Sequence, residues 1–599
     1  MMRRVMIVCG AMLCLLYGVS LASHVLAFLG IYRLDTFLVA APLSIAGAGW
    51  LYARGFGAWA AAIFPDPPLD PKFIPARERR LAQYDRACLI AAVTLLSLIF
   101  LLRVGLFPWS NVGDLVSADA IAYHFPKALE LVRTGTLWDV SFLYAEYPIG
   151  YEGLVAGGIL LTGTIFPAGF VQAITIILLI TTLALLVCRY SHLPVGIALL
   201  LVTGLCLHPS LYGLLLLIGK NDLLMTTGIL AAVLHSPLTV RSKSRDFHPV
   251  GLAFATMLAM SVKATGVVPL GFLWLLVFWK WGSDYRQSWG QPGRPSGSPL
   301  QNKTWRDDLM RDALNLLGLT LLMLPCGFWL IRNLVMMHRP FSPEVSGFFQ
   351  GSLLFNLTLP RLYTDGSESI TLIVLVLWGI VFIGLAAWRA GWKVAVLLAA
   401  FWIAFLMTPL GAFHTSERLT VHIEWRYITY LFLFMAVLIL AILAPLIHRA
   451  FALVVRRPIF VVIGFVALCG SILIYIDPIS GLIPRSSNVE RLANPYTEAD
   501  ETGSMNVYDY VRRFITDSVV YYNGIEPFYF YTLRTTNRFM DVNPHPLGMP
   551  DLVPRPRPDY LVQRKVWHVA PDGWPLWSDY AWNVVYEDSL MVVYEREGK

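Results

Sequence analysis

The stretch VMIVCGAMLCLLYGVSLASHVLAFLG, residues 5–30, contains no Asp, Glu, Lys or Arg. A helix of this length crosses the roughly 30 Å hydrocarbon core of a bilayer. Met1-Met2-Arg3-Arg4 precedes it, as basic residues precede the apolar part of a signal peptide, but the run is too long for one and lacks a small-residue exit. We therefore expect a retained membrane span and a helical membrane fold.

Apolar runs of similar length recur along most of the 599 residues, and 57% of the chain is hydrophobic while 14% is charged. Soluble domains of this size do not have such a composition. The formal charge of +7 is spread over short basic loops between the runs, which indicates the positive-inside rule rather than nucleic-acid binding. The seven cysteines lie in apolar runs without a C-x-x-C spacing, so neither a disulfide framework nor a thiolate metal site is indicated.

Placing the basic loops on the cytoplasmic side predicts a polytopic α-helical membrane protein of about thirteen spans, with its N-terminus inside and its C-terminal part outside. A Gly-rich half-span at 152–166 and a polar inside loop at 282–310 complete this topology. The expected spans are 5–30, 37–63, 87–107, 167–188, 194–216, 223–236, 250–262, 265–280, 312–334, 370–388, 393–412, 427–447 and 458–476.

Three parts follow from this pattern. Residues 1–86 form two spans and a cytoplasmic linker, and residues 87–477 form a membrane module whose first outer loop is 108–151. Residues 478–599 are polar and rich in Pro and Gly, which predicts a small extracytoplasmic α/β domain, interpreted as a cap or acceptor-recruiting module without catalysis. Its expected elements are a helix at 505–515 and strands at 518–522, 538–541, 559–563, 582–586 and 590–594, the last two as a hairpin.

The first outer loop contains Ser117-Ala118-Asp119-Ala120-Ile121-Ala122-Tyr123-His124. A carboxylate beside a bilayer is costly unless it has a partner or a task. Ser117 can cap a helix, Pro126 should kink or split it, and Gly135 can end it. We expect this helix to lie flat at the interface with its apolar stripe in lipid. The stripe consists of Ile121, Phe125, Ala128, Leu129 and Val132.

Asp119 and Tyr123 share a helix face at i, i+4 spacing, which would hold the carboxylate at a fixed depth. A capping role and a chemical role for Asp119 both stay open on these residues alone. His124 has no second histidine at ligand spacing, so a structural, hydrogen-bonded histidine is favoured over a metal ligand.

Further polar residues are expected at the same outer boundary. Basic groups there run against the positive-inside trend, and a lipid-linked phosphate or pyrophosphate would be a natural partner for them. Snorkelling and ion pairs within the protein are the alternatives. The residues concerned are Lys220, Asp222, Lys263, Arg332, Glu417, Arg418 and Arg426.

Several short motifs resemble those of the glycosyltransferase-C superfamily, in particular its protein-O-mannosyltransferase-like group, which includes bacterial aminoarabinose and galacturonic acid transferases acting on lipopolysaccharide. The resemblance covers about 87–599, and the first two spans look like an N-terminal addition. The motifs are Asp119–Pro126, Leu137-Trp138, Tyr147-Pro148-Ile149-Gly150-Tyr151-Glu152, Lys220-Asn221-Asp222, Lys263-Ala264-Thr265-Gly266, Trp329-Leu330-Ile331-Arg332-Asn333 and Arg426-Tyr427.

The resemblance implies transfer of a hexosyl or pentosyl unit from a polyprenyl-phosphate donor to a hydroxyl of a glycan, lipid or protein on the periplasmic side of a bacterial inner membrane. It assigns the general base to Asp119 and implies inversion. Donor and acceptor contacts would come from Asp222, Tyr123, His124, Tyr147 and Glu152, and phosphate contacts from Lys220, Lys263, Arg332 and Arg426.

Many relatives show two adjacent acidic residues at the position of Asp119, whereas here Ala118 precedes it and Ala120 follows it. This departure suits a metal-independent enzyme: no cofactor is required and no metal ligand is assigned, although the residues leave room for a divalent cation. Two other classes fit the same outer cavity. One is a transporter or flippase of lipid-linked sugars, and the other is a non-catalytic scaffold for envelope assembly.

Overall fold

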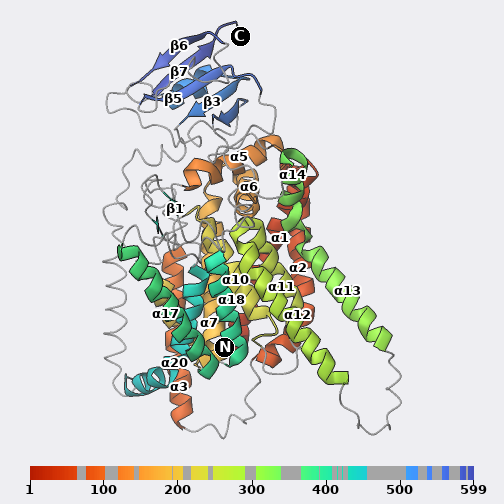
Figure 1. The fold of residues 1–599 in the computed structure, drawn as a ribbon, viewed down its shortest axis with the longest axis vertical. Coiled ribbons are helices and arrows are strands. Elements are labelled where there is room, and N and C mark those ends of the chain that lie inside the picture. The colour runs from red at the N-terminus through yellow and green to blue at the C-terminus, as the bar shows by residue number, and fades with distance from the viewer. Residues whose placement is uncertain are drawn as a thin grey trace.

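In the computed structural model, the structure describes residues 1–63, 76–100, 119–139, 147–191, 193–206, 218–239, 247–289, 305–338, 366–389, 391–407, 414–415, 421–422, 429–454, 507–523, 536–542, 556–565, 580–588 and 591–598. Helices make up the body of the molecule, and a small sheet lies beyond one end of it, next to α5 (Phe125–Thr134) and α6 (Gly150–Thr162) (Figure 1). The N-terminus lies in the lower half of the body and the C-terminus in the sheet.

The helices of the body follow the apolar runs. They are α1 Met2–Phe28, α2 Leu34–Ile63, α3 Ala76–Phe100, α6 Gly150–Thr162, α7 Pro167–Ser191, α8 Val195–Cys206, α10 Asn221–His235, α11 Pro249–Val262, α12 Val267–Trp289, α13 Trp305–Met323, α14 Phe328–Met337, α17 Gly366–Arg389, α18 Trp392–Met407 and α20 Thr429–Val454. Short 3₁₀ turns, Ala264–Gly266 and Leu324–Gly327, join α11 to α12 and α13 to α14. The expected break between the spans 250–262 and 265–280 is therefore confirmed.

Several helices extend beyond their expected bounds. Both predicted boundaries of the polar loop 282–310 are wrong, because α12 continues to Trp289 and α13 already begins at Trp305. Likewise α20 continues to Val454, past the expected end at 447. A helix satisfies its own backbone hydrogen bonds, so it can continue past the apolar boundary while its charged side chains face outward. The expected span 458–476 lies outside the described residues.

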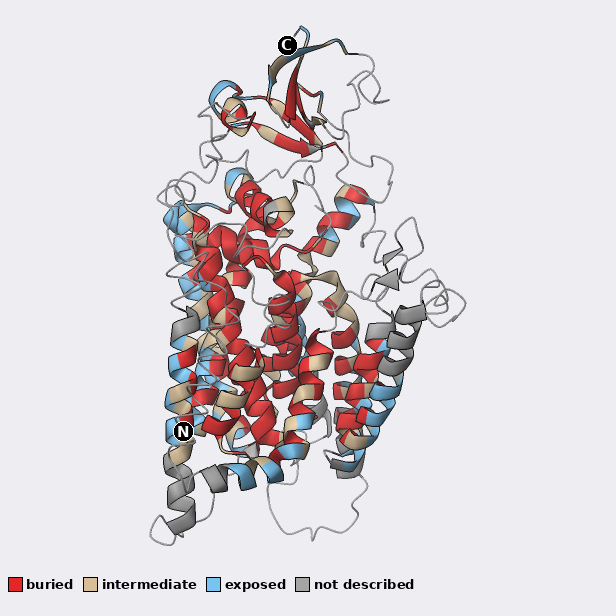
Figure 2. Cartoon of the chain, turned by 90° about the vertical axis from the view of Figure 1, so that its left-hand side faces the viewer, coloured by how far each residue is buried: buried red, intermediate tan, exposed pale blue. Residues whose placement is uncertain are grey.

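Five helices in the described part of the chain are long and apolar enough to cross a membrane: Met2–Phe28, Leu34–Ala61, Pro167–Ser191, Leu314–Met337 and Thr429–Ala450. Shorter apolar helices stand beside them. Large apolar side chains such as Leu43, Ile380 and Trp388 are exposed, as expected of a surface that faces lipid. Figure 2 shows exposed residues along the outer helices of the body. The count of about thirteen spans stays a prediction.

Small residues let the helices approach closely. A Cβ added at Gly228 of α10 would lie 2.8 Å from the Ala259 Cβ and 2.9 Å from the Ala255 carbonyl oxygen of α11. Backbones this close gain packing that lipid cannot supply. The two N-terminal helices belong to the same core: α1 packs on α2, α6, α7 and α11, and Tyr17 donates a 2.9 Å hydrogen bond to the Leu322 carbonyl.

The sheet has the order β4-β3-β5-β7-β6. Its strands are β3 Val519–Asn523, β4 Arg538–Asp541, β5 Tyr560–Arg564, β6 Trp582–Glu587 and β7 Met591–Arg596, and the helix α24 Val507–Phe514 packs on β6 and β7. β3 pairs in parallel with β4 and β5, whereas β7 pairs antiparallel with β5 and β6. The five predicted strands, the helix and the terminal hairpin are thus confirmed. A two-residue pair, β1 His414–Thr415 with β2 Val421–His422, lies elsewhere.

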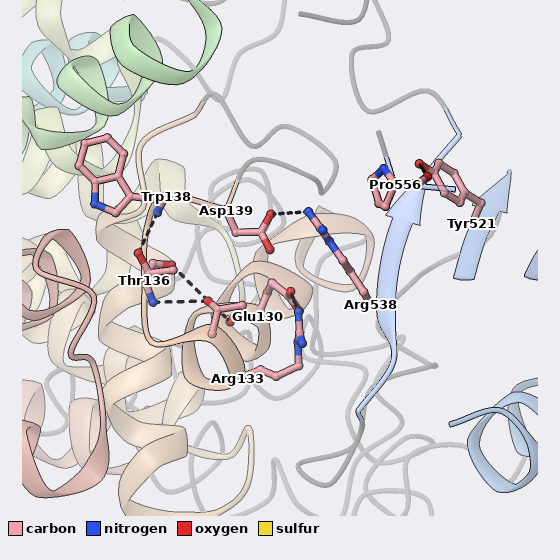
Figure 3. Close-up of polar contacts among 9 residues, drawn as sticks. Glu130, Arg133, Thr136, Trp138, Asp139, Tyr521, Arg538 and Pro556 are labelled. Atoms are coloured by element: carbon pink, nitrogen blue, oxygen red, sulfur yellow. Dashed lines mark hydrogen bonds and ion pairs between the residues drawn. The ribbon is translucent and has the colours of Figure 1, made fainter. Parts of the chain in front are cut away.

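The sheet meets the helical body at residues 135–139, the segment that directly follows α5. The Arg538 Nη2 atom, at the start of β4, lies 3.7 Å from the Asp139 Oδ1 atom (Figure 3). The same segment is tied to the end of α1, because the Trp138 Nε1–H donates a 2.8 Å hydrogen bond to the Phe28 carbonyl. Residues 135–139 therefore connect the N-terminal helices with the C-terminal sheet.

Candidate functional site

Asp119 stands at the start of a turn that is wider than an α-helix. Residues Ala120–His124 form a π-helix, η4, and α5 follows directly at Phe125. The change of helix type falls between His124 and Phe125, directly before Pro126, where the sequence predicted a kink or split. Gly135 ends α5 in the left-handed conformation, with φ of 70°, as predicted. The proposed cap, Ser117, lies outside the described residues.

The apolar face of α5 packs against protein, which corrects the expectation that its apolar stripe faces lipid. Phe125, Ala128 and Leu129 are buried, and α5 contacts α6. The first turns of α6 contain Gly150, Gly153 and Gly157, so neighbouring helices can cover it closely. Val132 is half-buried, and the side chain of Ile121 is outside the described part.

The Asp119 carboxylate faces a lysine that precedes α10. Its Oδ2 atom lies 3.6 Å from the Lys220 Nζ atom, and the two side chains are 28% and 15% exposed. Neither side chain is fully buried, so solvent partly screens this ion pair. Asp119 and Lys220 therefore form a partly exposed ion pair at the start of α10.

The next pair lies at the same helix start. Asp222, in the first turn of α10, accepts a 2.5 Å hydrogen bond from the Lys263 Nζ atom at the end of α11. Asp222 is buried, whereas the Lys263 side chain is 13% exposed. The neighbouring Asn221 donates a 3.4 Å hydrogen bond to the Val262 carbonyl, which further joins the two helix ends. Asp222, predicted to contact donor or acceptor, is thus paired with a basic side chain in this structure.

Behind these groups lies a buried cluster, which we call the Glu152 cluster and define as Glu152, His124 and Lys127. The His124 Nδ1–H donates to the Glu152 Oε1 atom at 2.7 Å, and the Lys127 Nζ atom lies 3.8 Å from the same oxygen. Burial opposes ionisation, but Lys127 and the His124 hydrogen bond outweigh it and hold the pKa of Glu152 below its ordinary value. Glu152 is thus a carboxylate that ties α6 to η4 and α5.

Arg332 is also buried. Its Nη2 atom donates to the Tyr147 carbonyl at 3.2 Å and to the Asn333 Oδ1 atom at 2.8 Å. The ring of Tyr147 lies under the Lys127 ammonium, with 5.9 Å from Nζ to the ring centroid. Arg332 therefore holds the backbone just before α6, next to the Glu152 cluster.

The structure brings most of the predicted residues together at the end of the body that faces the sheet. Asp119, Lys220 and Lys263 are partly exposed and Asp222 is buried, while Tyr123 lies half-buried on η4 beside His124. His124, Glu152 and Arg332 are buried, and Tyr147 is half-buried. Glu417, Arg418 and Arg426 lie outside the described residues.

Sequence reasoning missed Lys127 and Asn221. Lys127 follows His124 at i, i+3 spacing, so it could have been found as a second partner on the same helix face. Asn221 lies between two residues that were selected, but its bond to the Val262 carbonyl depends on how α10 meets α11. Within the described residues, no group of three or more His, Cys, Asp or Glu side chains is placed to hold a metal ion.

Comparison with known proteins adds little to this geometry. No protein-family model and no curated protein matches the chain. Among solved structures, the chain is similar to the crystal structure of ArnT from Cupriavidus metallidurans bound to undecaprenyl phosphate, with a TM-score of 0.46 and 13% sequence identity over 84% of this chain and 97% of that chain. A likeness at this level does not establish a shared family.

Proposed function

We propose that this protein is a membrane glycosyltransferase of the glycosyltransferase-C type. It would move a sugar from a polyprenyl-phosphate donor to a hydroxyl of a glycan, lipid or protein at the periplasmic face of a bacterial inner membrane. The observation that carries the proposal is the partly exposed Asp119 carboxylate, 3.6 Å from the Lys220 ammonium and beside the start of α10. A base and cations are then available within one small region.

In the proposed reaction, the acceptor oxygen forms a bond to the anomeric carbon while the bond from that carbon to the donor phosphate oxygen breaks. Asp119 takes the proton of the acceptor hydroxyl as general base. The electron pair leaves on the polyprenyl phosphate, whose charge needs stabilisation rather than a proton. Lys220 and Lys263, both partly exposed, are suited to that task. Direct displacement inverts the anomeric centre.

The buried residues take supporting roles in this proposal. Arg332 was predicted to contact phosphate, but its burial and its bond to the Tyr147 carbonyl favour a role in holding Tyr147. His124 and Glu152 were predicted to contact donor or acceptor, and their burial favours support of η4 instead. Tyr123 and Tyr147 remain the candidate sugar contacts, and Arg426 remains a candidate phosphate contact.

The test is Asp119→Asn in the purified, folded chain with a polyprenyl-phosphate sugar. Loss of the base should lower turnover by about 10²–10⁴-fold. The matched control is Asp35→Asn, which removes an exposed carboxylate from the first turn of α2 and should leave turnover unchanged.

Release of polyprenyl phosphate together with a glycosylated product identifies a transferase. Movement of the intact donor across a vesicle membrane without bond cleavage would identify a flippase instead. Undiminished turnover by Asp119→Asn would eliminate the assigned base, and no release and no movement in the wild-type chain would point to a scaffold.

A further inference from the structure

The turn that follows Asp119 is unusual for a helix of this body. Residues Ala120–His124 are π-helical, and the Phe125 N–H donates to the Ala120 carbonyl, five residues back. A π turn accommodates one residue more than an α turn. Since successive residues of an α-helix are about 100° apart around its axis, this extra residue decides the direction in which Asp119 points.

Pro126 gives a physical reason for the wide turn. Its nitrogen cannot donate to the carbonyl of Ala122, and in an α-helix its ring would collide with that carbonyl. The wider π turn moves the carbonyl away while Phe125 keeps a backbone hydrogen bond. The sequence thus favours the π conformation at this place.

A buried hydrogen bond holds the end of the turn. His124, the last π-helical residue, donates to the Glu152 carboxylate at 2.7 Å, and both side chains are at most 2% exposed. Glu152 lies in the first turn of α6, which cannot shift easily because the Cα of Gly150 faces Ser261 of α11. A Cβ at Gly150 would lie 2.6 Å from the Ser261 carbonyl oxygen.

We propose that the π turn and its His124–Glu152 bond are a positioning device for Asp119, with His124 and Glu152 as positioning residues for transfer. The device directs the carboxylate toward Lys220, across the 3.6 Å gap between them. Its catalytic meaning rests on the proposed glycosyltransferase function. If the turn relaxed to an α-helix, Asp119 would rotate by roughly 100° and lose Lys220.

The geometric test does not require transfer. Asp119→Cys and Lys220→Cys are combined in the full chain, and the two thiols are joined with a short bis-methanethiosulfonate reagent. The six native cysteines in the described residues are buried, which keeps their background reaction low. Adding Pro126→Ala should lower the cross-linking yield several-fold. Adding Pro42→Ala, which alters an exposed proline inside α2, should not.

The kinetic test uses the chain with both native residues 119 and 220. Pro126→Ala and Glu152→Gln should lower kcat on the order of 10²-fold with little change in KM, because a base is displaced while the substrate contacts remain. His124→Asn, which keeps an N–H donor near the position of Nδ1, should retain more kcat than His124→Ala.

The two tests fail separately. Equal cross-linking yields with and without Pro126→Ala would overturn the positioning device. A proportional loss of kcat and of folded protein in each variant, with His124→Asn no better than His124→Ala, would also overturn it, because that pattern is purely structural. Altered cross-linking in a chain whose wild type transfers no sugar would leave the device intact and reject the proposed function.

Discussion

Two groups of charges flank the same helix, α5, and they differ in burial. Toward α6, the Glu152 cluster places a carboxylate and an ammonium 3.8 Å apart with side chains at most 2% exposed. Toward the sheet, Asp139 and Arg538 lie 3.7 Å apart, but the arginine side chain is 41% exposed. Nearly equal distances therefore join charges in very different surroundings.

Burial determines how much each pair of charges contributes to stability. Charges inside the protein interact strongly, but each loses its hydration and depends on its partner. A pair that is partly solvated is screened and contributes little. The Glu152 cluster should therefore commit η4 and α5 to one position on α6, whereas the junction to the sheet should be easily broken.

The largest effect is expected for Glu152→Ala. It removes the carboxylate that His124 and Lys127 share in the interior, and loss of one partner from a buried pair costs about 3–5 kcal/mol. The control is Glu587→Ala, whose pair with Lys565 is 2.6 Å long but has side chains that are 53% and 35% exposed. That variant should lose about 1 kcal/mol or less. Thermal unfolding in detergent measures the stability of both variants. Equal losses of stability in the two variants would contradict the comparison.

A backbone contact beside the Glu152 cluster should give the next largest effect. In Gly150→Ala the new Cβ would lie 2.4 Å from the Ser261 Oγ atom and 2.6 Å from the Ser261 carbonyl oxygen, so α6 must shift, at a cost of about 1–3 kcal/mol. Gly318→Ala in α13 meets nothing within 4 Å and should be neutral or stabilising. The free energy of unfolding in denaturant separates them, and a neutral Gly150→Ala would show that α6 is free to move.

These contrasts mark what the sequence could predict. The lengths of the apolar runs located the helices. Short strand-like runs between Gly- and Pro-rich turns located β3 to β7 almost to the residue. The roles of Pro126 and Gly135 also followed from their own chemistry, because each acts on its local backbone.

Features that depend on distant packing could not be predicted. The apolar stripe of α5 has the same pattern whether it faces lipid or α6, so the sequence did not distinguish the two. Lys127 and Glu152 are far apart in the chain, and their pairing exists because α5 folds onto α6. The polar residues at the outer boundary could be chosen from their charge and their predicted side of the membrane. Which of them are exposed and which are buried depends on the fold.

The pH dependence of stability should have opposite signs for two glutamates. The folded pKa of Glu152 is lowered, so its contribution is present above the ordinary value of 4.5 and is lost as pH falls through the folded pKa. Burial raises the pKa of Glu130 despite its bonds to Arg133, so its contribution is present below 4.5 and is lost as pH rises through the folded pKa. Unfolding of Glu152→Gln and Glu130→Gln, each compared with wild type from acid to neutral pH, tests this. The stability of wild type relative to the variant should rise with pH for Glu152→Gln and fall with pH for Glu130→Gln, and parallel curves would refute it.

The smallest effect is expected at the junction between the sheet and the segment after α5. Arg538→Gln and Asp139→Asn should each change stability slightly, and their double-mutant cycle should give a coupling of about 0.2–1 kcal/mol, since Arg538 is 41% exposed. The coupling should fall further as salt rises, because solvated charges are screened. A coupling of several kcal/mol that salt leaves unchanged would mean that the sheet is fastened to α5 as firmly as α6 is. In that case the two faces of α5 would be equivalent, and the position of Asp119 would depend on the sheet as well as on Glu152.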